Sequence, residues 1–176
     1  MPIKITRTLY VGLGGTGAKS ILQTKKCFID AYGEVPPMVS FLAIDTDTAI
    51  KELAFTSRNG KSVKFDDNEI CFCGIKGSAV AIVNQNPTQY QWLPPRNKQN
   101  LNNLMGTGAG QIRSNGRFLA RYNANNIQDL IANKVAHIAR PLPQNCKFTY
   151  DTNQDNVEYP TKVNIVGSVA GGTGSG

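Results

Sequence analysis

The sequence predicts an α/β fold in which a mostly parallel β-sheet is flanked by helices. Apolar, β-favouring runs alternate with stretches in which apolar residues recur every three or four positions. The clearest runs end in glycines or acids, at residues 12–17, 45–47 and 171–176. Ligands of parallel sheets bind at the carboxyl ends of the strands, so these three segments are candidates for one site.

The elements are predicted in order along the chain. Residues 3–13 alternate and then turn apolar, which predicts one buried strand ending in glycines. Helical spacing from Gly17 to Tyr32 predicts a helix, which Gly33 and the prolines at 36–37 end. Residues 39–44 then predict a second strand, directly followed by two acids.

The middle of the chain has weaker signals. We expect a helix at 48–55, a turn at 58–60, short strands near Val63 and Ile70, and a loop-rich stretch at 87–103. Residues 117–122 and 127–138 predict two helical pieces or one kinked helix. A polar stretch at 151–160 predicts an exposed loop or hairpin, and residues 162–169 predict the last strand.

Composition and charge narrow the class of protein. The 176 residues are 40% hydrophobic and 18% charged, as expected for one globular domain. Residues 1–10 do not resemble a secretory signal and no apolar run is long enough to span a membrane, so we expect a cytoplasmic chain. The formal net charge is +7, but Lys25 and Lys26 are the only adjacent basic pair, so we do not expect nucleic acid as a direct partner.

The spacing of the cysteines and the single histidine does not indicate a metal site or a catalytic triad. A cytoplasmic chain keeps its four cysteines reduced. Cys71 and Cys73 lack two further ligands for zinc, so we expect them to alternate along a strand. His137 is the only histidine and has no visible triad partner, so we expect it on a helix surface or in the core.

The first glycine segment, residues 12–17 (GLGGTG), stands between a predicted strand and a predicted helix. Glycines let the backbone approach a phosphate, and the helix N-terminus offers unpaired N–H groups. The alternative is a packing turn with no ligand. A P-loop is disfavoured because one residue too many precedes Lys19.

The second and third glycine segments strengthen this prediction. Residues 106–110 (GTGAG) precede Gly116 and a helical stretch, and residues 171–176 (GGTGSG) follow the last strand. Successive backbone N–H groups and the hydroxyls of Thr173 and Ser175 are phosphate donors. Three such segments at strand ends can enclose a polyphosphate.

These motifs resemble the tubulin and FtsZ superfamily of GTP-binding filament proteins. The segment AGGTGSG at 170–176 is similar to its signature loop, GLGGTG at 12–17 to the first glycine loop of FtsZ, and FLAIDTD at 41–47 to the strand that FtsZ ends with Asn-Thr-Asp. The segment 106–116 keeps the spacing of the loop that senses the γ-phosphate. The four appear in family order, and the divergent bacterial tubulin-like proteins resemble the chain more than FtsZ does.

The chain also departs from the family pattern. Lys19 stands where FtsZ carries an asparagine, and the stretches 50–104 and 151–160 look like insertions. Residues 1–176 are expected to be the amino-terminal part of a Rossmann-like GTPase domain, because the family's purine-contacting loops, central helix and activating acidic loop would follow Gly176. This part alone is not expected to hydrolyse GTP, and it holds no candidate catalytic residue.

The resemblance implies GTP or GDP and magnesium as ligands, and head-to-tail self-association into filaments with hydrolysis at the subunit interface. It implies that the first and third segments hold the α- and β-phosphates, and that Ala109 and Gly110 approach the γ-phosphate. Asp45 and Asp47 would meet magnesium through water, or instead cap a helix. The predicted site residues are Gly12, Gly14, Gly15, Thr16, Gly17, Asp45, Asp47, Gly108, Ala109, Gly110, Gly171, Gly172, Thr173, Gly174 and Ser175.

Two alternatives remain open. A Rossmann-type enzyme that binds NAD or adenylates a substrate would use residues 12–17 and Asp45, but Asp45 follows Gly17 by 28 residues rather than about 20. That reading leaves the second and third glycine segments unexplained. A non-hydrolysing structural homologue would keep the fold and the filament contacts. The preference for guanine rests on the resemblance alone.

Overall fold

A four-stranded parallel sheet forms the centre of the computed structural model, which describes residues 2–98, 101, 104, 108–151 and 160–175. Its strands lie in the order β6 (Ile70–Phe72), β3 (Val39–Asp45), β2 (Thr8–Leu13) and β8 (Lys162–Gly167). The predicted α/β class with a mostly parallel sheet is thus confirmed.

The order of the strands creates a switch point at one end of the sheet. The chain runs outward from β2 to β3 and β6, and then returns to place β8 on the other side of β2. Gly12 of β2 therefore pairs with Ala43 on one side and Val166 on the other. In such sheets the crevice between the diverging connections, here beyond β2 and β8, is the usual ligand site.

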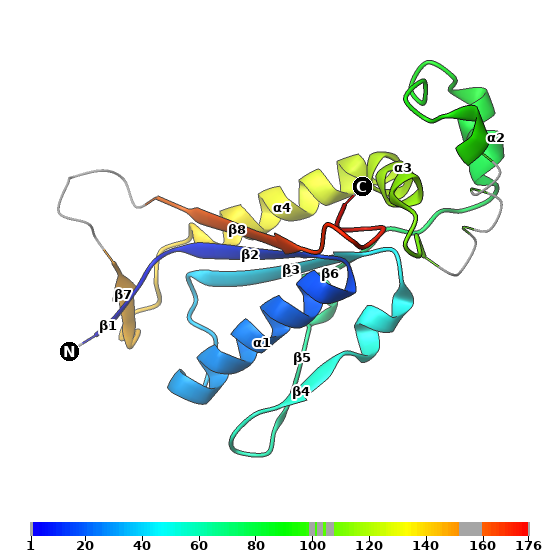
Figure 1. The fold of residues 1–176 in the computed structure, drawn as a ribbon. Coiled ribbons are helices and arrows are strands. Elements are labelled where there is room, and N and C mark those ends of the chain that lie inside the picture. The colour runs from blue at the N-terminus through cyan, green and yellow to red at the C-terminus, as the bar shows by residue number, and fades with distance from the viewer. Residues whose placement is uncertain (1, 99–100, 102–103, 105–107, 152–159, 176) are drawn as a thin grey trace.

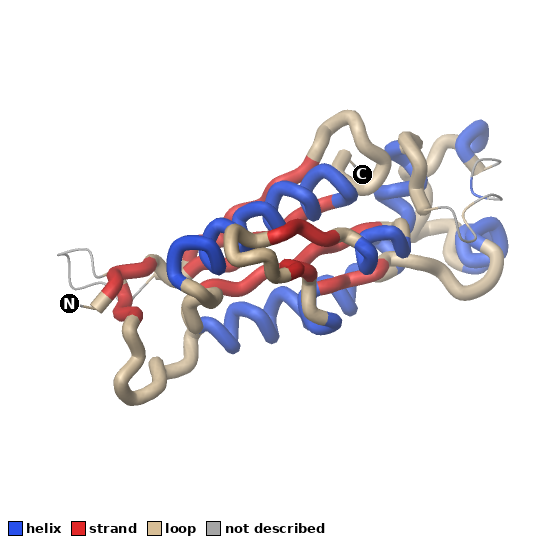
Figure 2. The backbone as a smooth tube through the Cα atoms, turned by 90° about the horizontal axis from the view of Figure 1, so that it is seen from below, coloured by secondary structure: helices blue, strands red, loops and turns tan. Residues whose placement is uncertain are grey.

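Helices cover both faces of the sheet (Figures 1 and 2). The helix α1 (Gly14–Tyr32) packs Ile21 and Leu22 against Phe41 and Ala43 of β3. The helix α4 (Ala124–Ile138) lies on the opposite face, where the buried residues are Leu9, Val11, Leu42, Ile44, Cys71, Cys73 and Ile138. Successive side chains of a strand point to opposite faces, so β3 is buried along its whole length.

Two predictions for the start of the chain need correction. Residues 3–13 form two strands, because β1 (Ile3–Ile5) leaves the main sheet and pairs in parallel with β7 (Phe148–Tyr150). The pattern of apolar residues continues from β1 into β2, so the sequence does not show that these two strands belong to different sheets. The helix α1 begins at Gly14 rather than Gly17, because Gly14 turns the chain directly at the strand end with a φ of +67°.

The middle of the chain is partly as predicted. The strands β5 (Ser62–Lys64) and β6 confirm the pieces near Val63 and Ile70, and β5 pairs with β4 (Ala54–Thr56) around the predicted turn. The expected helix at 48–55 is only the 3₁₀ turn η1 (Thr48–Glu52), since its last residues join β4. The 3₁₀ turn η2 (Asp67–Glu69) leads into β6.

The stretch between β6 and α4 forms its own small core. It contains α2 (Ala79–Gln85), which was not predicted, the 3₁₀ turn η3 (Pro95–Asn97) and α3 (Arg113–Tyr122). Their cluster includes Val83, Tyr90, Leu93, Leu101, Phe118 and Leu119. A break at Asn123 separates α3 from α4, so the two-helix alternative was right, although both helices begin earlier than predicted.

The remaining expectations have mixed outcomes. Most of the stretch 151–160 lies outside the described residues, and β8 ends at Gly167, before Val169. Cys71 and Cys73 are buried around an exposed Phe72, which confirms the alternation, and His137 is exposed on α4. All four cysteines are free thiols. Within the described ranges, no helix has the length and apolar character that a membrane span requires.

Candidate functional site

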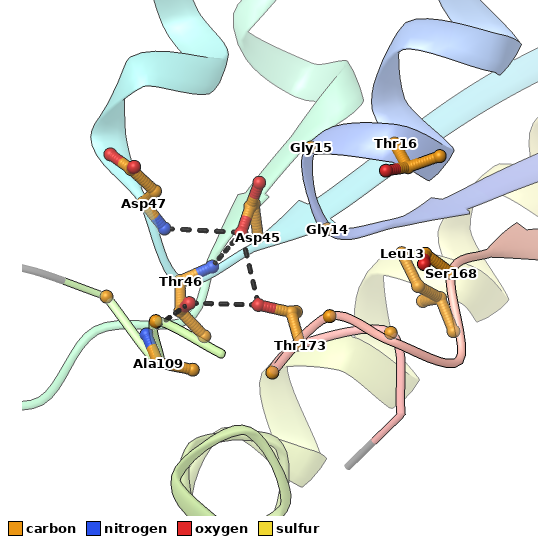
Figure 3. Close-up of a pocket in the computed structure, with 15 residues that line it drawn as sticks. Leu13, Gly14, Gly15, Thr16, Asp45, Thr46, Asp47, Ala109, Ser168 and Thr173 are labelled. Atoms are coloured by element: carbon orange, nitrogen blue, oxygen red, sulfur yellow. Dashed lines mark hydrogen bonds between the residues drawn. The ribbon is translucent and has the colours of Figure 1, made fainter. Parts of the chain in front are cut away.

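A cavity of about 220 Å³ opens at the switch point, beyond the carboxyl ends of β2, β3 and β8 (Figure 3). All three predicted glycine segments and both predicted acids reach it. Its lining residues are Leu13, Gly14, Gly15, Thr16, Asp45, Thr46, Asp47, Gly108, Ala109, Gly110, Ser168, Gly171, Gly172, Thr173 and Gly174. Segments that lie far apart in the sequence thus meet at one place.

The first segment brings the N-terminus of α1 to the cavity. The first backbone N–H groups of a helix have no partner within the helix. Leu13 occupies the capping position without a side-chain hydrogen bond, and the first turn of α1 holds no acid. The N–H groups at Gly14, Gly15 and Thr16 therefore lack a capping side chain, and together with the helix dipole they suit an anion.

Gly12 and Gly17, the first and last glycines of the first segment, pack against the backbone. Neither lines the cavity. A Cβ atom on Gly12 would lie 2.6 Å from the carbonyl oxygen of Gly17, and one on Gly17 would overlap the carbonyl of Val166. These two glycines allow α1 to approach the sheet closely, so the packing-turn alternative holds for them.

The second segment contacts residues 45–47 and the third segment. Gly108 and Gly110 have φ values of +67° and +58°, a left-handed conformation that favours glycine. The buried N–H of Ala109 donates to Oγ1 of Thr46 at 2.8 Å. Gly106, the first residue of the motif, lies outside the described residues.

The third segment is tied to the second through the backbone. The N–H of Gly172 donates to the carbonyl of Gly110 at 3.2 Å. Ser175, a predicted phosphate contact, does not line the cavity, and its hydroxyl donates to the carbonyl of Gly171 instead. Ser175 therefore shapes the loop.

A directed chain of hydrogen bonds joins the second and third glycine segments to Asp45 and Thr46 (Figure 3). The Ala109 N–H can only donate to Thr46, and the ionised Asp45 carboxylate can only accept from Thr173, at 3.2 Å. The hydroxyls of Thr46 and Thr173 lie 2.9 Å apart, so Thr46 must donate to Thr173 if both terminal bonds are made. Hydrogen bonds arranged in this way polarise and strengthen one another.

The two acids differ in their surroundings. Oδ1 of Asp45 accepts from the Thr46 N–H at 2.7 Å, the Asp47 N–H at 3.3 Å and the Thr173 hydroxyl. Burial raises the pKa of Asp45, and these hydrogen bonds oppose the rise. Oδ2 of Asp45 faces Gly15. A Cβ atom added to Gly15 would lie 3.9 Å from this oxygen.

Asp47 is more exposed and caps η1, because its Oδ1 accepts from the N–H of Ala49 at 2.9 Å. Asp47 thus makes the predicted helix cap, which leaves its second carboxylate oxygen without a bond in the cap. Among the described residues, no group of three or more acidic, histidine or cysteine side chains could hold a metal by itself. Magnesium commonly binds through one or two carboxylates together with water and phosphate oxygens, and the pair Asp45 and Asp47 fits that pattern.

The size and charge of the cavity indicate the kind of ligand. A volume of about 220 Å³ is below the roughly 300–1,000 Å³ of pockets that enclose a whole small molecule, so the cavity suits a phosphate chain. Among the described residues, no lysine or arginine lines it. Backbone N–H groups, hydroxyls and a helix dipole are thus its positive features.

Three lining residues were missed from the sequence: Leu13, Thr46 and Ser168. Thr46 stands between the two predicted acids, and a small hydroxyl at a strand end was a usable signal. Ser168 directly follows β8, which the sequence extended to Val169 and so past the cavity. Leu13 carries an apolar side chain and gave no signal for a phosphate site.

Comparison with known proteins agrees with this geometry. A family model described as tubulin like matches residues 9–176, which is nearly the whole chain. The search of curated proteins and the search of solved structures each found no match. The matched range contains every segment that lines the cavity. The chain belongs to the tubulin-like family.

Proposed function

We propose that this protein binds GTP and GDP with magnesium, and that the phosphates occupy the cavity at the switch point. The observation that carries the proposal is the uncapped N-terminus of α1, which opens onto a cavity bordered by two further glycine segments. Such a helix end needs an acceptor, and a phosphate chain supplies oxygens to all three segments at once.

Different groups of the chain would contact different phosphates. The N–H groups at Gly14, Gly15 and Thr16, with those of the third segment, hold the α- and β-phosphates. Ala109 and Gly110 approach the γ-phosphate, and the chain of hydrogen bonds through Thr46 holds this segment against Thr173. Positioning of this kind supplies much of the catalysis in phosphoryl transfer.

Magnesium, when bound, neutralises phosphate charge that no basic side chain of the cavity can balance. Asp45 would hold it through Oδ2, since Oδ1 already accepts three hydrogen bonds. Asp47 would act through water while it caps η1. A buried carboxylate with a raised pKa gains from a neighbouring cation, because the cation favours its ionised form.

We further propose that subunits associate head to tail into cytoplasmic filaments and that GTP is hydrolysed where a neighbouring subunit completes the site. This part rests on membership of the tubulin-like family. Residues 1–176 would supply the phosphate-binding part of the domain, with 50–104 and 151–160 as insertions. A homologue that binds GTP without hydrolysing it would keep the same cavity.

Isothermal titration calorimetry tests nucleotide binding directly. GTP, ATP and NAD are titrated, each with and without magnesium, into the product of the complete reading frame. We expect GTP to bind best and magnesium to strengthen it. Tight binding of NAD or ATP, indifferent to changes in the third segment, would instead support the Rossmann-type enzyme.

Adjacent glycines offer a matched pair of variants. A Cβ on Gly172 would overlap the carbonyl of Gly110 and lie 3.0 Å from Cβ of Ala109, whereas one on Gly171 has only an ordinary contact at 3.8 Å. We expect Gly172→Ala to weaken GTP binding about tenfold or more, which is ~1.4 kcal/mol. Gly171→Ala should bind nearly as the parent does. Sedimentation with GTP and with GDP then tests filament formation, and phosphate release tests hydrolysis.

A further inference from the structure

The positive charge of this protein is concentrated in one part of the chain. Residues 70–128 contain six of the nineteen Lys and Arg residues and none of the twelve Asp and Glu residues. The thirteen basic and twelve acidic residues elsewhere nearly cancel. Almost the whole net charge of +7 therefore comes from this acid-free stretch.

The stretch is also a structural unit. Residues 75–122, here called the basic lobe, contain all six of its cations. Its helices and turns pack around their own cluster, in which Val83 of α2 and Phe118 of α3 are buried. Figure 1 shows α2 beyond the end of the sheet at which the cavity lies.

Three of the cations form a stripe on α3. Arg113, Arg117 and Arg121 are four residues apart, so they follow one another along one side of the helix at intervals of about 6 Å. All three are exposed, and they lie opposite Phe118 and Leu119, which face the lobe's core. Across the described part of the chain, none of the three forms an ion pair with an acid.

A cleft of about 360 Å³ accompanies the stripe. Gln89, Trp92, Arg117, Ala120 and Arg121 line it. The Arg117 guanidinium lies 4.4 Å from the centre of the Trp92 ring, which holds the middle of the stripe in place. Tyr122 and Ile112, at the two ends of α3, are 41% and 40% exposed.

We propose that the stripe and its cleft are a docking surface for an acidic helical segment of a partner protein. Charge complementarity points to an acidic partner, since the lobe offers cations and no carboxylate to balance them. Arginine matches a carboxylate with two parallel N–H groups, and a spacing of four residues matches acids four apart on a second helix. Arginine, tryptophan and tyrosine are also the residues that dominate binding energy at protein interfaces.

The surface fits nucleic acid less well. Single strands bind by stacking bases on open aromatic rings, but the Trp92 ring already carries the Arg117 guanidinium. The exposed Ile112 and Tyr122 add apolar area near the stripe, which suits a protein side chain. The proposal is independent of nucleotide binding, because no residue of the stripe lines the phosphate cavity.

Trp92 provides the assay, because it is the only tryptophan within residues 1–176. Its fluorescence is followed while the complete chain is titrated with a helical peptide of about 16 residues that carries Glu at every fourth position and Leu beside each Glu. The same peptide with Gln in place of Glu, and a thymidine oligonucleotide of similar length, serve as comparison probes. We expect saturable binding of the acidic peptide that weakens as salt is raised.

Two double variants with the same change in net charge locate the site. Arg117→Gln with Arg121→Gln should weaken the acidic peptide at least tenfold. Lys51→Gln with Lys61→Gln removes two exposed cations outside the lobe and should leave it unchanged. Binding is measured for both by anisotropy of labelled peptide, so that loss of the Arg117 contact with Trp92 does not affect the readout.

Each contrary result overturns the proposal. Absence of binding, or equal weakening by both double variants, means that the stripe is only a solvated helix face. Equal binding of the Gln peptide removes the electrostatic argument. Tighter binding of the oligonucleotide than of the acidic peptide assigns the surface to nucleic acid instead.

Discussion

Thr46 offers the sharpest test of how the cavity is held together. Its hydroxyl accepts from the Ala109 N–H at 2.8 Å and lies 2.9 Å from the Thr173 hydroxyl. The variant Thr46→Val keeps the shape of the side chain and removes both bonds. Its effect therefore reports the hydrogen bonds and not a cavity in the core.

The magnitude follows from the burial of the partners. Two net hydrogen bonds contribute about 1–3 kcal/mol, and a buried N–H left without an acceptor costs a similar amount. Ala109 is 2% exposed, so water cannot easily replace the lost acceptor. Thr173 keeps its bond to Asp45 and limits the loss. We expect Thr46→Val to lower the free energy of unfolding by about 2 kcal/mol, which is a fall in Tm of ~4–8 °C for a chain of this size.

Urea unfolding followed by circular dichroism measures the change, with Thr46→Ser as the matched control. Serine keeps the hydroxyl and loses one buried methyl group, at a cost of about 0.8 kcal/mol. GTP affinity should fall for Thr46→Val and stay near the parent value for Thr46→Ser. If the valine variant is as stable as the serine variant and binds GTP equally, the chain of hydrogen bonds does not organise the site.

Three further predictions concern other parts of the fold. Burial raises the pKa of Asp45. At pH values between its ordinary pKa and the raised one, the native state therefore binds more protons than the unfolded state. The free energy of unfolding of the parent then falls as pH rises through this range. The stability of Asp45→Asn relative to the parent should therefore increase with pH over this range, which urea unfolding from pH 4 to 7 measures. If the difference in free energy of unfolding between variant and parent is the same at every pH, the reasoning is refuted. Lys25→Met should lower the free energy of unfolding by about 3 kcal/mol, because Lys25 and Glu69 are both buried and lie 2.6 Å apart; adding Glu69→Gln should recover much of the loss, and a stable single variant would show that the pair is unimportant. Gly116→Ala should lower Tm, because its Cβ would overlap the carbonyl of Gly172, although the same change in an open helix gains about 1 kcal/mol from propensity; a rise in Tm would mean that α3 does not touch the third segment.

The sequence by itself determined the fold class and most of the segments that meet at the cavity. Apolar runs that end in glycine or acid are local signals, and the rule that parallel strands end at one edge brings them together without further information. For that reason the sequence predicts that the segments at Gly14, Asp45, Ala109 and Gly172 lie together, and all four line one cavity.

Only the tertiary structure decided what each residue does there. Gly12 and Gly14 belong to the same motif, but one packs against the backbone of Gly17 and the other faces the cavity. Thr46 joins two segments that lie 63 and 127 residues further along the chain, a distance that no local pattern reports.

The charged residues also show the difference between what the sequence determines and what the tertiary structure decides. The absence of acids between Glu69 and Asp129 can be read from the sequence, whereas the basic residues there are all isolated and gave no sign of a cluster. The helix α3 gathers three of them into one stripe, because residues four apart lie on the same side of a helix. Local patterns determine which elements form, and contacts between elements determine which side chains act together.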